Sequence, residues 1–105
     1  MAGFVVITFS SLKYLPDLLE KYKDKKIVVT LLTYAKALKS SINPLMFENI
    51  WVRAYSHKPI KINDLDEADS ESLLVAQELS ALLVASDEKV EKVAKEMNIN
   101  VVHFP

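Results

Sequence analysis

The sequence contains no cysteine and only one glycine among its 105 residues. Without cysteine the chain has no disulfide framework, no thiolate zinc site and no cysteine nucleophile. With Gly3 as its one glycine, it also lacks the glycine-rich loop that cradles nucleotide phosphates. The uncharged stretch 1–12 follows no basic residue and is too short to span a bilayer, so neither a signal peptide nor a membrane partner is indicated. We therefore expect a cytoplasmic protein, which the lack of cysteine also fits.

The composition is that of a folded globular protein. Hydrophobic residues make up 50% of the chain and charged residues 26%. A chain of this length can bury an adequate core without the help of a metal or a disulfide. The sequence therefore predicts a single domain over residues 1–105.

The net charge of −1 hides an uneven distribution of charge along the chain. Residues 1–61 carry ten basic and four acidic side chains, whereas residues 62–105 carry three basic and ten acidic ones. Such a division predicts two surfaces with different partners, an anionic polymer on the basic one and a cation on the acidic one. In the alternative interpretation, the two halves interleave in the fold and their charges neutralise each other.

Short β-branched runs alternate along the chain with amphipathic segments. The runs predict strands at 4–8, 27–30, 50–55, 82–85 and 101–104. The amphipathic segments predict helices at 15–22, 31–38 and 70–80, and a fourth helix that Ser86 caps. Strict alternation of strands and helices is typical of a parallel sheet with right-handed crossovers. We therefore expect an α/β fold, a three-layer domain in which a parallel five-stranded sheet has helices on both faces.

Two carboxylates are expected at the edge of the sheet where such domains bind ligands. Asp69 and Asp87 each lie at the start of a helix, beyond the carboxyl ends of the strands. Oxygen ligands from separate carboxylates suit a cation such as Mg²⁺, which can activate water against a phosphodiester. In the alternative, both acids only complement the helix dipole, an effect worth about 0.3–1 kcal/mol each.

At this point the sequence resembles a known family. Residues 69–76 (DSESLLVA) followed by 82–87 (LLVASD) resemble the C-terminal half of a PIN domain, in which one acid opens a buried helix and another follows the next strand in a Thr-x-Asp turn. The opening residues 5–10 (VVITFS) are similar to the first strand of that family, which ends in an Asp-x-Ser motif. The resemblance implies the PIN fold and a metal-dependent ribonuclease that gathers three or four carboxylates around Mg²⁺ or Mn²⁺.

The sequence departs from that family at two of the four acidic positions. Asp69 matches the third acid and Asp87 the fourth, so the resemblance implies that these two would be catalytic and would bind the metal. Thr8 stands where the first aspartate belongs, and Ala35 and Lys36 are the nearest residues to the second acid. Half of the expected negative charge is therefore missing.

Two consequences of the missing acids are open. If Lys36 points inward, it would occupy the vacated cation position and pair with Asp69 or Asp87. Alternatively, Asp66 and Glu67 would replace the absent ligands from the preceding loop. The first consequence favours a catalytically degenerate domain without a cofactor, and the second an active Mg²⁺- or Mn²⁺-dependent endoribonuclease of the toxin type.

A second set of residues is typical of nucleic-acid binding. Alternation in the predicted strand 50–55 places Trp51, Arg53 and Tyr55 on one face of that strand. Lysines follow this strand in the sequence, and other lysines precede the strand 27–30. Aromatic planes stack on unpaired bases, and basic side chains contact phosphates. The predicted RNA-binding residues are Trp51, Arg53, Tyr55, Lys58, Lys61, Lys23, Lys25 and Lys26. In the alternative, Trp51 and Tyr55 pack beneath a helix and the lysine run is a solvated turn.

Taken together, these features predict a degenerate PIN-like domain that acts as a binding or scaffold module in RNA metabolism. Its partner would be RNA or a ribonucleoprotein particle, such as a ribosomal or RNA-processing particle, or the protein would derive from a toxin–antitoxin pair. A third hypothesis is a protein–protein adaptor or homodimer that uses the aromatic residues of 50–55 and never contacts RNA.

Overall fold

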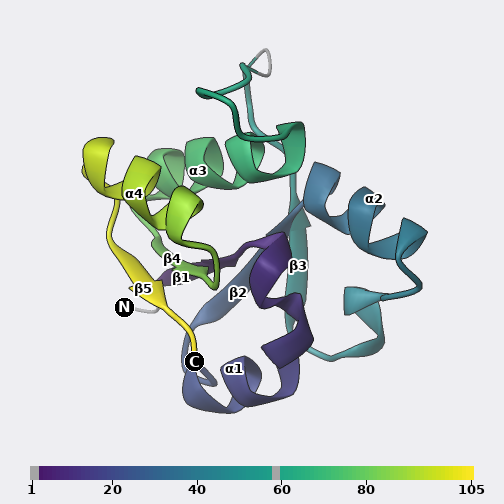
Figure 1. Ribbon diagram of the computed structural model, residues 1–105. Helices are drawn as coiled ribbons and strands as arrows, with labels where there is room; N and C mark the ends of the chain where they lie inside the picture. Colours follow the sequence, from purple (N-terminus) through teal and green to yellow (C-terminus); the bar gives the residue numbers. More distant parts are fainter. Residues whose placement is uncertain (1–2, 58–59) are drawn as a thin grey trace.

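The computed structural model describes residues 3–57 and 60–105. Within them five strands form one sheet in the order β3-β2-β1-β4-β5, and neighbouring strands are parallel. The strands are β1 (Phe4–Ile7), β2 (Lys26–Thr30), β3 (Ile50–Arg53), β4 (Leu82–Ala85) and β5 (Val101–His103). The α-helices are α1 (Leu15–Lys21), α2 (Leu31–Lys39), α3 (Glu67–Leu79) and α4 (Glu88–Glu96), and the 3-10 helices are η1 (Phe9–Tyr14) and η2 (Pro44–Met46) (Figure 1).

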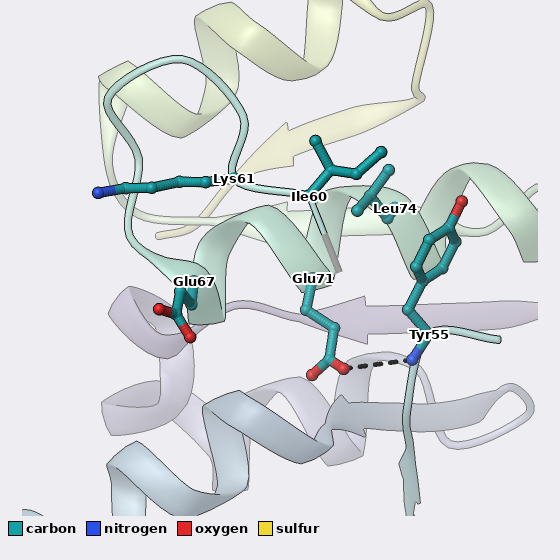
Figure 2. Close-up of a pocket in the computed structure, with 6 residues that line it drawn as sticks. All are labelled: Tyr55, Ile60, Lys61, Glu67, Glu71 and Leu74. Carbon is teal, nitrogen blue, oxygen red and sulfur yellow. Dashed lines mark hydrogen bonds between the residues drawn. The ribbon is translucent and has the colours of Figure 1, made fainter. Parts of the chain in front are cut away.

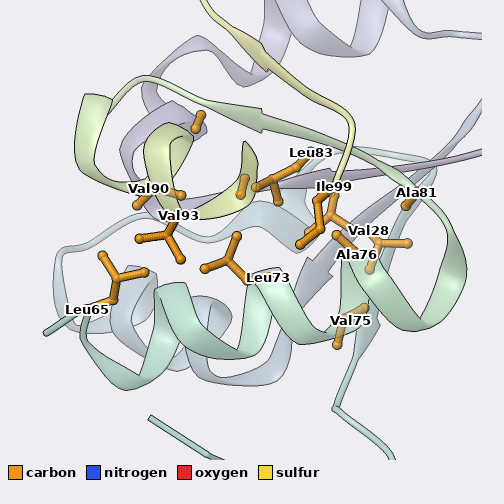
Figure 3. Close-up of a cluster of buried hydrophobic side chains, with 13 residues drawn as sticks. Val28, Leu65, Leu73, Val75, Ala76, Ala81, Leu83, Val90, Val93 and Ile99 are labelled. Carbon is orange, nitrogen blue, oxygen red and sulfur yellow. The ribbon is translucent and has the colours of Figure 1, made fainter. Parts of the chain in front are cut away.

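Helices pack on both faces of this sheet. On one face, α3 and α4 enclose a core cluster that includes Leu73, Leu83 and Val93 (Figure 3). On the other face, a second cluster includes Leu18 of α1 and Ala37 of α2. The predicted three-layer α/β domain with a parallel five-stranded sheet is therefore confirmed.

The central position of β1 follows from its sequence. Val5, Val6 and Ile7 are each at most 1% exposed, because β1 lies between β2 and β4 and has helices on both sides. An uninterrupted β-branched run is the pattern expected for a strand that is buried on both faces.

The ends of several elements differ from the prediction. The helix α3 begins at Glu67 rather than at residue 70, because the carboxylate of Asp66 caps it by accepting a hydrogen bond from the Asp69 amide. The prediction that Ser86 caps α4 is wrong, since Asp87 is the N-cap and accepts from the Lys89 amide. The hydroxyl of Ser86 instead donates to the Phe104 carbonyl.

The basic and acidic halves of the chain occupy different parts of the domain. Residues 1–61 form β3, β2 and β1 with the helices of one face, and residues 62–105 form β4, β5 and the helices of the other. The strands of the two halves therefore do not interleave, although α3 of the acidic half packs on β1 and β2. Among the ion pairs of the described residues, Lys36–Asp66 is the one that joins the two halves.

Candidate functional site

The predicted acidic residues meet at the edge of the sheet where the strands end. Asp66 caps α3, Asp69 is the third residue of α3, and Asp87 caps α4. Asp66 and Asp87 are near enough to Asp69 for their charges to raise its pKa. We call Asp66, Asp69 and Asp87 the acid cluster.

A lysine lies against this acid cluster. The Nζ atom of Lys36 is 2.6 Å from Oδ2 of Asp66 and 4.3 Å from the centre of the Phe9 ring. Although burial acts to raise it, the hydrogen bonds from Lys36 and from the Asp69 amide hold the pKa of Asp66 below its ordinary value. Lys36 reaches the acid cluster, with 41% of its side chain exposed, and its ion pair is with Asp66 rather than with Asp69 or Asp87. The reason is that capping α3 turns the Asp66 carboxylate toward α2.

The carboxyl group of Asp69 has an unusual proton affinity. Burial is the largest cause, and together with the charges of Asp66 and Asp87 it raises the pKa of Asp69 from 3.8 to about 6, against the opposing effect of Lys36. Because the folded protein disfavours the charged form of the Asp69 carboxyl, the contribution of this group to the free energy of unfolding changes with pH.

We expect the substitution Asp69→Asn to stabilise the protein at about pH 8 but not at about pH 4. Because the folded-state pKa lies above the unfolded value, the stabilising protonation is fully present below pH 3.8 and is lost as the pH rises through about 6. The gain at high pH should be on the order of 1–3 kcal/mol, measured by urea unfolding at the two pH values. An Asp69→Asn variant less stable than wild type at the higher pH would show that the carboxylate is stabilising there. The exposed neighbour Glu67→Gln serves as the control.

A neutral hydroxyl, that of Thr8, stands where the first aspartate is expected, and other hydroxyl groups lie near it. Thr8 is fully buried, and its hydroxyl donates to the Val84 carbonyl at 2.9 Å. Ser10 accepts a hydrogen bond from the Ser86 amide at 3.0 Å. A second set of hydroxyl groups lies in the interior between α2 and α3. It consists of the side chains of Thr30, Thr33 and Ser72, which are hydrogen-bonded to one another. Within each network the hydrogen bonds of the hydroxyl groups are satisfied by the protein itself. Within the described residues no buried side-chain polar atom lacks a hydrogen-bond partner.

The side chains present do not fit a divalent cation as they stand. One oxygen of Asp66 accepts from Lys36 and the other from the Asp69 amide, and Thr8 donates its hydroxyl to the backbone. The exposed Glu67 lies at the rim of two hollows, one of them shared with Lys36. In residues 3–57 and 60–105, no three acidic or histidine side chains are grouped so that they would hold a metal ion. A hard cation requires several free oxygen ligands, and this arrangement does not supply them.

A buried glutamate that sequence analysis missed ties the neighbouring elements together. Glu71 of α3 is 4% exposed and accepts hydrogen bonds from the Leu32 amide at 2.8 Å and the Tyr55 amide at 3.2 Å (Figure 2). It therefore joins α3 to the start of α2 and to the segment after β3. It lines a hollow of about 240 Å³, which Tyr55, Ile60, Lys61, Glu67 and Leu74 complete.

The predicted RNA-binding residues fall into separate groups. Trp51 is 58% exposed and Arg53 is exposed on the edge strand β3, so the alternative that Trp51 packs beneath a helix is wrong. Tyr55 is half-buried and packs against the α3 core cluster, as that alternative predicted. The ammonium group of Lys26 lies 5.6 Å from the centre of the Trp51 ring, which places Lys26 in the same group.

The remaining predicted lysines lie elsewhere. Lys23 and Lys25 are in the exposed turn between α1 and β2, where Lys23 is 3.7 Å from Glu20. Lys61 is exposed beside Tyr55 at the Glu71 hollow. Lys58 lies outside the described residues. The structure thus does not gather all eight residues on one surface.

The fold and the acid cluster together define a class of protein, a parallel α/β domain with a carboxylate cluster at the ends of its strands. The chain is similar to the structure of a PilT N-terminus domain protein from the hyperthermophilic archaeon Sulfolobus solfataricus P2. The two share 39% sequence identity with a TM-score of 0.88, over 95% of this chain and 86% of that one. The chain therefore belongs to the PIN-domain family, whose fold is that of nuclease-type and RNA-related modules.

Two other comparisons give no match. Neither a scan against protein-family models nor a search of curated proteins finds a relative of this chain. In the part of the chain that the structure describes, no helix has the length and apolar character needed to cross a membrane.

Proposed function

We propose that this protein is a catalytically degenerate PIN domain that binds RNA, alone or within a ribonucleoprotein particle of the cytoplasm. The observation that carries the proposal is the position of Lys36, whose ammonium group pairs with Asp66 at 2.6 Å in the acid cluster. A tethered cation there occupies the carboxylate that a metal would need. The protein then works without a cofactor, and Asp69 and Asp87 are relics of a catalytic centre.

The charge distribution supports RNA as the partner. Residues 1–61 carry ten basic and four acidic side chains, and the strands β1, β2 and β3 come from this half of the chain. Lysine and arginine side chains that contact phosphates release condensed counterions, so the affinity for RNA should fall steeply as salt is raised. The exposed aromatic ring of Trp51 adds a surface on which unpaired bases stack.

The second candidate function is an active Mg²⁺- or Mn²⁺-dependent endoribonuclease. It is favoured by the placement of Asp66, Asp69 and Asp87 at the first turns of α3 and α4, at the same edge of the sheet. In that case Lys36 would have to leave Asp66, two or three carboxylates would hold the metal, and the metal would supply the activation of the attacking water.

One electrophoresis experiment separates these functions. Single-stranded and structured RNA are incubated with the protein in Mn²⁺ or in EDTA, beside an Asp87→Asn variant, and are then run on native and denaturing gels. We expect intact RNA that both proteins retard, with or without EDTA, and retardation that weakens at higher salt. Metal-dependent cleavage that Asp87→Asn abolishes would instead establish the nuclease. Intact RNA that neither protein retards would point to a protein partner or a homodimer.

A further inference from the structure

A separate hollow of about 200 Å³ lies on the β3 edge of the sheet. Its lining comes from the first strands of the basic half and combines aromatic, aliphatic and basic side chains: Phe4, Lys26, Val28, Trp51, Val52 and Arg53. None of these residues belongs to the acid cluster or to the Glu71 hollow. Its chemistry therefore has to be explained independently of the degenerate centre.

The topology of the sheet leaves this hollow open. The register pairs Phe4 with Lys26 and Val28 with Trp51, so these side chains share one face of the sheet. On that face the chain runs from the end of β3 through α3 to β4, which lies on the far side of β1. The helix α3 therefore packs on β1 and β2 rather than on β3. The outer strand is left uncovered on this face, where Trp51 is 58% exposed.

The side chains of the hollow are arranged for a ligand that is both planar and anionic. The ammonium group of exposed Lys26 is 5.6 Å from the centre of the Trp51 ring and 5.7 Å from that of Phe4, within cation–π range of both rings. Within the described residues, no carboxylate pairs with Lys26 or Arg53. An exposed indole ring and two positive charges without a carboxylate partner among the described residues therefore line the same hollow.

We propose that this hollow binds an unpaired nucleotide of single-stranded RNA, an inference that rests on the proposed RNA binding. The base stacks on the indole ring of Trp51, and Lys26 and Arg53 contact the adjacent phosphates. Double-stranded RNA does not fit this arrangement, because its bases are stacked on one another and their faces are not accessible. The bound strand lies along the β3 edge, away from the acid cluster.

The single tryptophan of the chain makes this proposal directly measurable. Because Trp51 is the only tryptophan, fluorescence excited at wavelengths that the four tyrosines do not absorb reports on this hollow alone. The protein is titrated with oligouridylate, with oligoadenylate and with a blunt RNA duplex of equal length. Binding is followed in parallel by the anisotropy of a dye on the RNA. We expect quenching by the single strands, and no quenching by the duplex.

Substitutions then assign the contacts. Trp51→Ala should weaken single-strand binding about 5- to 100-fold, the range for loss of one base–aromatic stack, and Trp51→Phe should weaken it less. Lys26→Ala and Arg53→Ala should each lower the salt slope of log K by about one. Lys95→Ala, which removes an exposed charge from α4 in the acidic half, is the matched control and should leave the slope unchanged. Circular dichroism melts verify that each variant is folded.

The outcomes separate this proposal from the proposed function. RNA that binds without quenching, and equally well to Trp51→Ala, would overturn this site and leave the RNA-binding function in place. RNA that does not bind at all would overturn both. A concentration-dependent increase in mass that Trp51→Ala abolishes, without RNA binding, would assign the β3 edge to a second copy of the chain and would likewise overturn the nucleotide site.

Discussion

Replacing Glu71 by alanine is expected to lower the free energy of unfolding by about 2–4 kcal/mol. The carboxylate is 4% exposed and accepts hydrogen bonds from the amides of Leu32 and Tyr55. Each buried donor that loses its acceptor costs about 1–3 kcal/mol. The neighbouring hollow of about 240 Å³ admits water that recovers part of this loss. Urea unfolding monitored by circular dichroism measures the change.

Two further variants test this explanation of the Glu71 effect. Glu71→Gln keeps one acceptor oxygen but turns an NH₂ group toward the other amide, so we expect about half of the loss. Glu78→Ala removes an exposed carboxylate from the same helix and should change stability by less than about 0.5 kcal/mol. If Glu78→Ala were as destabilising as Glu71→Ala, the effect would come from the helix α3 itself rather than from the two amides.

Glu71 also shows where sequence reasoning ends. A glutamate inside the buried stretch of α3 indicates that its carboxylate has a polar partner. The partners of Glu71, however, are backbone amides that lie 39 and 16 residues away in the sequence. Backbone donors have no side-chain signature, so only the folded chain identifies them. By contrast, the Asp66–Asp69 cap is local, and an aspartate three residues before the first buried helical turn would have indicated the start of α3.

The strands could be predicted well because their pattern is local. The apolar runs alternate with amphipathic segments along the chain, and this alternation predicts a parallel sheet. The exposure of Trp51 was not predictable in this way, because it depends on β3 being an edge strand, and strand order is a property of the whole fold. The hydroxyl of Ser86 failed as a cap for the same reason, since its partner is the distant Phe104 carbonyl.

The acid cluster was predicted in part. The placement of Asp69 and Asp87 beyond the strand ends follows from the general position of ligand sites in parallel sheets. The contact of Lys36 with the acid cluster was predicted only as a condition, because the sequence does not fix the direction of a half-exposed lysine side chain. Its partner was predicted wrongly, because the role of Asp66 as the cap of α3 was not recognised.

Replacing Lys36 by glutamate is expected to create a divalent-cation site in the acid cluster. The substitution removes the ammonium group that pairs with Asp66 and adds a carboxylate beside Asp66, Asp69 and Asp87. Several carboxylate oxygens are what Mn²⁺ and Mg²⁺ require. We expect the affinity for Mn²⁺ to rise at least tenfold above that of the wild type, which corresponds to about 1.4 kcal/mol. The loss of the free Mn²⁺ signal in electron paramagnetic resonance measures it without reference to activity.

The same variant should be less stable than the wild type in EDTA, because four carboxylates then repel one another. Mn²⁺ should restore its stability, by about 2.7 kcal/mol at a hundred times the dissociation constant. Lys36→Gln removes the charge without adding a ligand and should show a smaller gain in affinity. Lys39→Glu makes the same change of charge on the same helix, at an exposed residue, and should show no stabilisation by Mn²⁺. If the wild type bound Mn²⁺ as tightly as Lys36→Glu does, Lys36 would not be holding the position of the cation, and the degenerate centre would have to be reinterpreted as a working one.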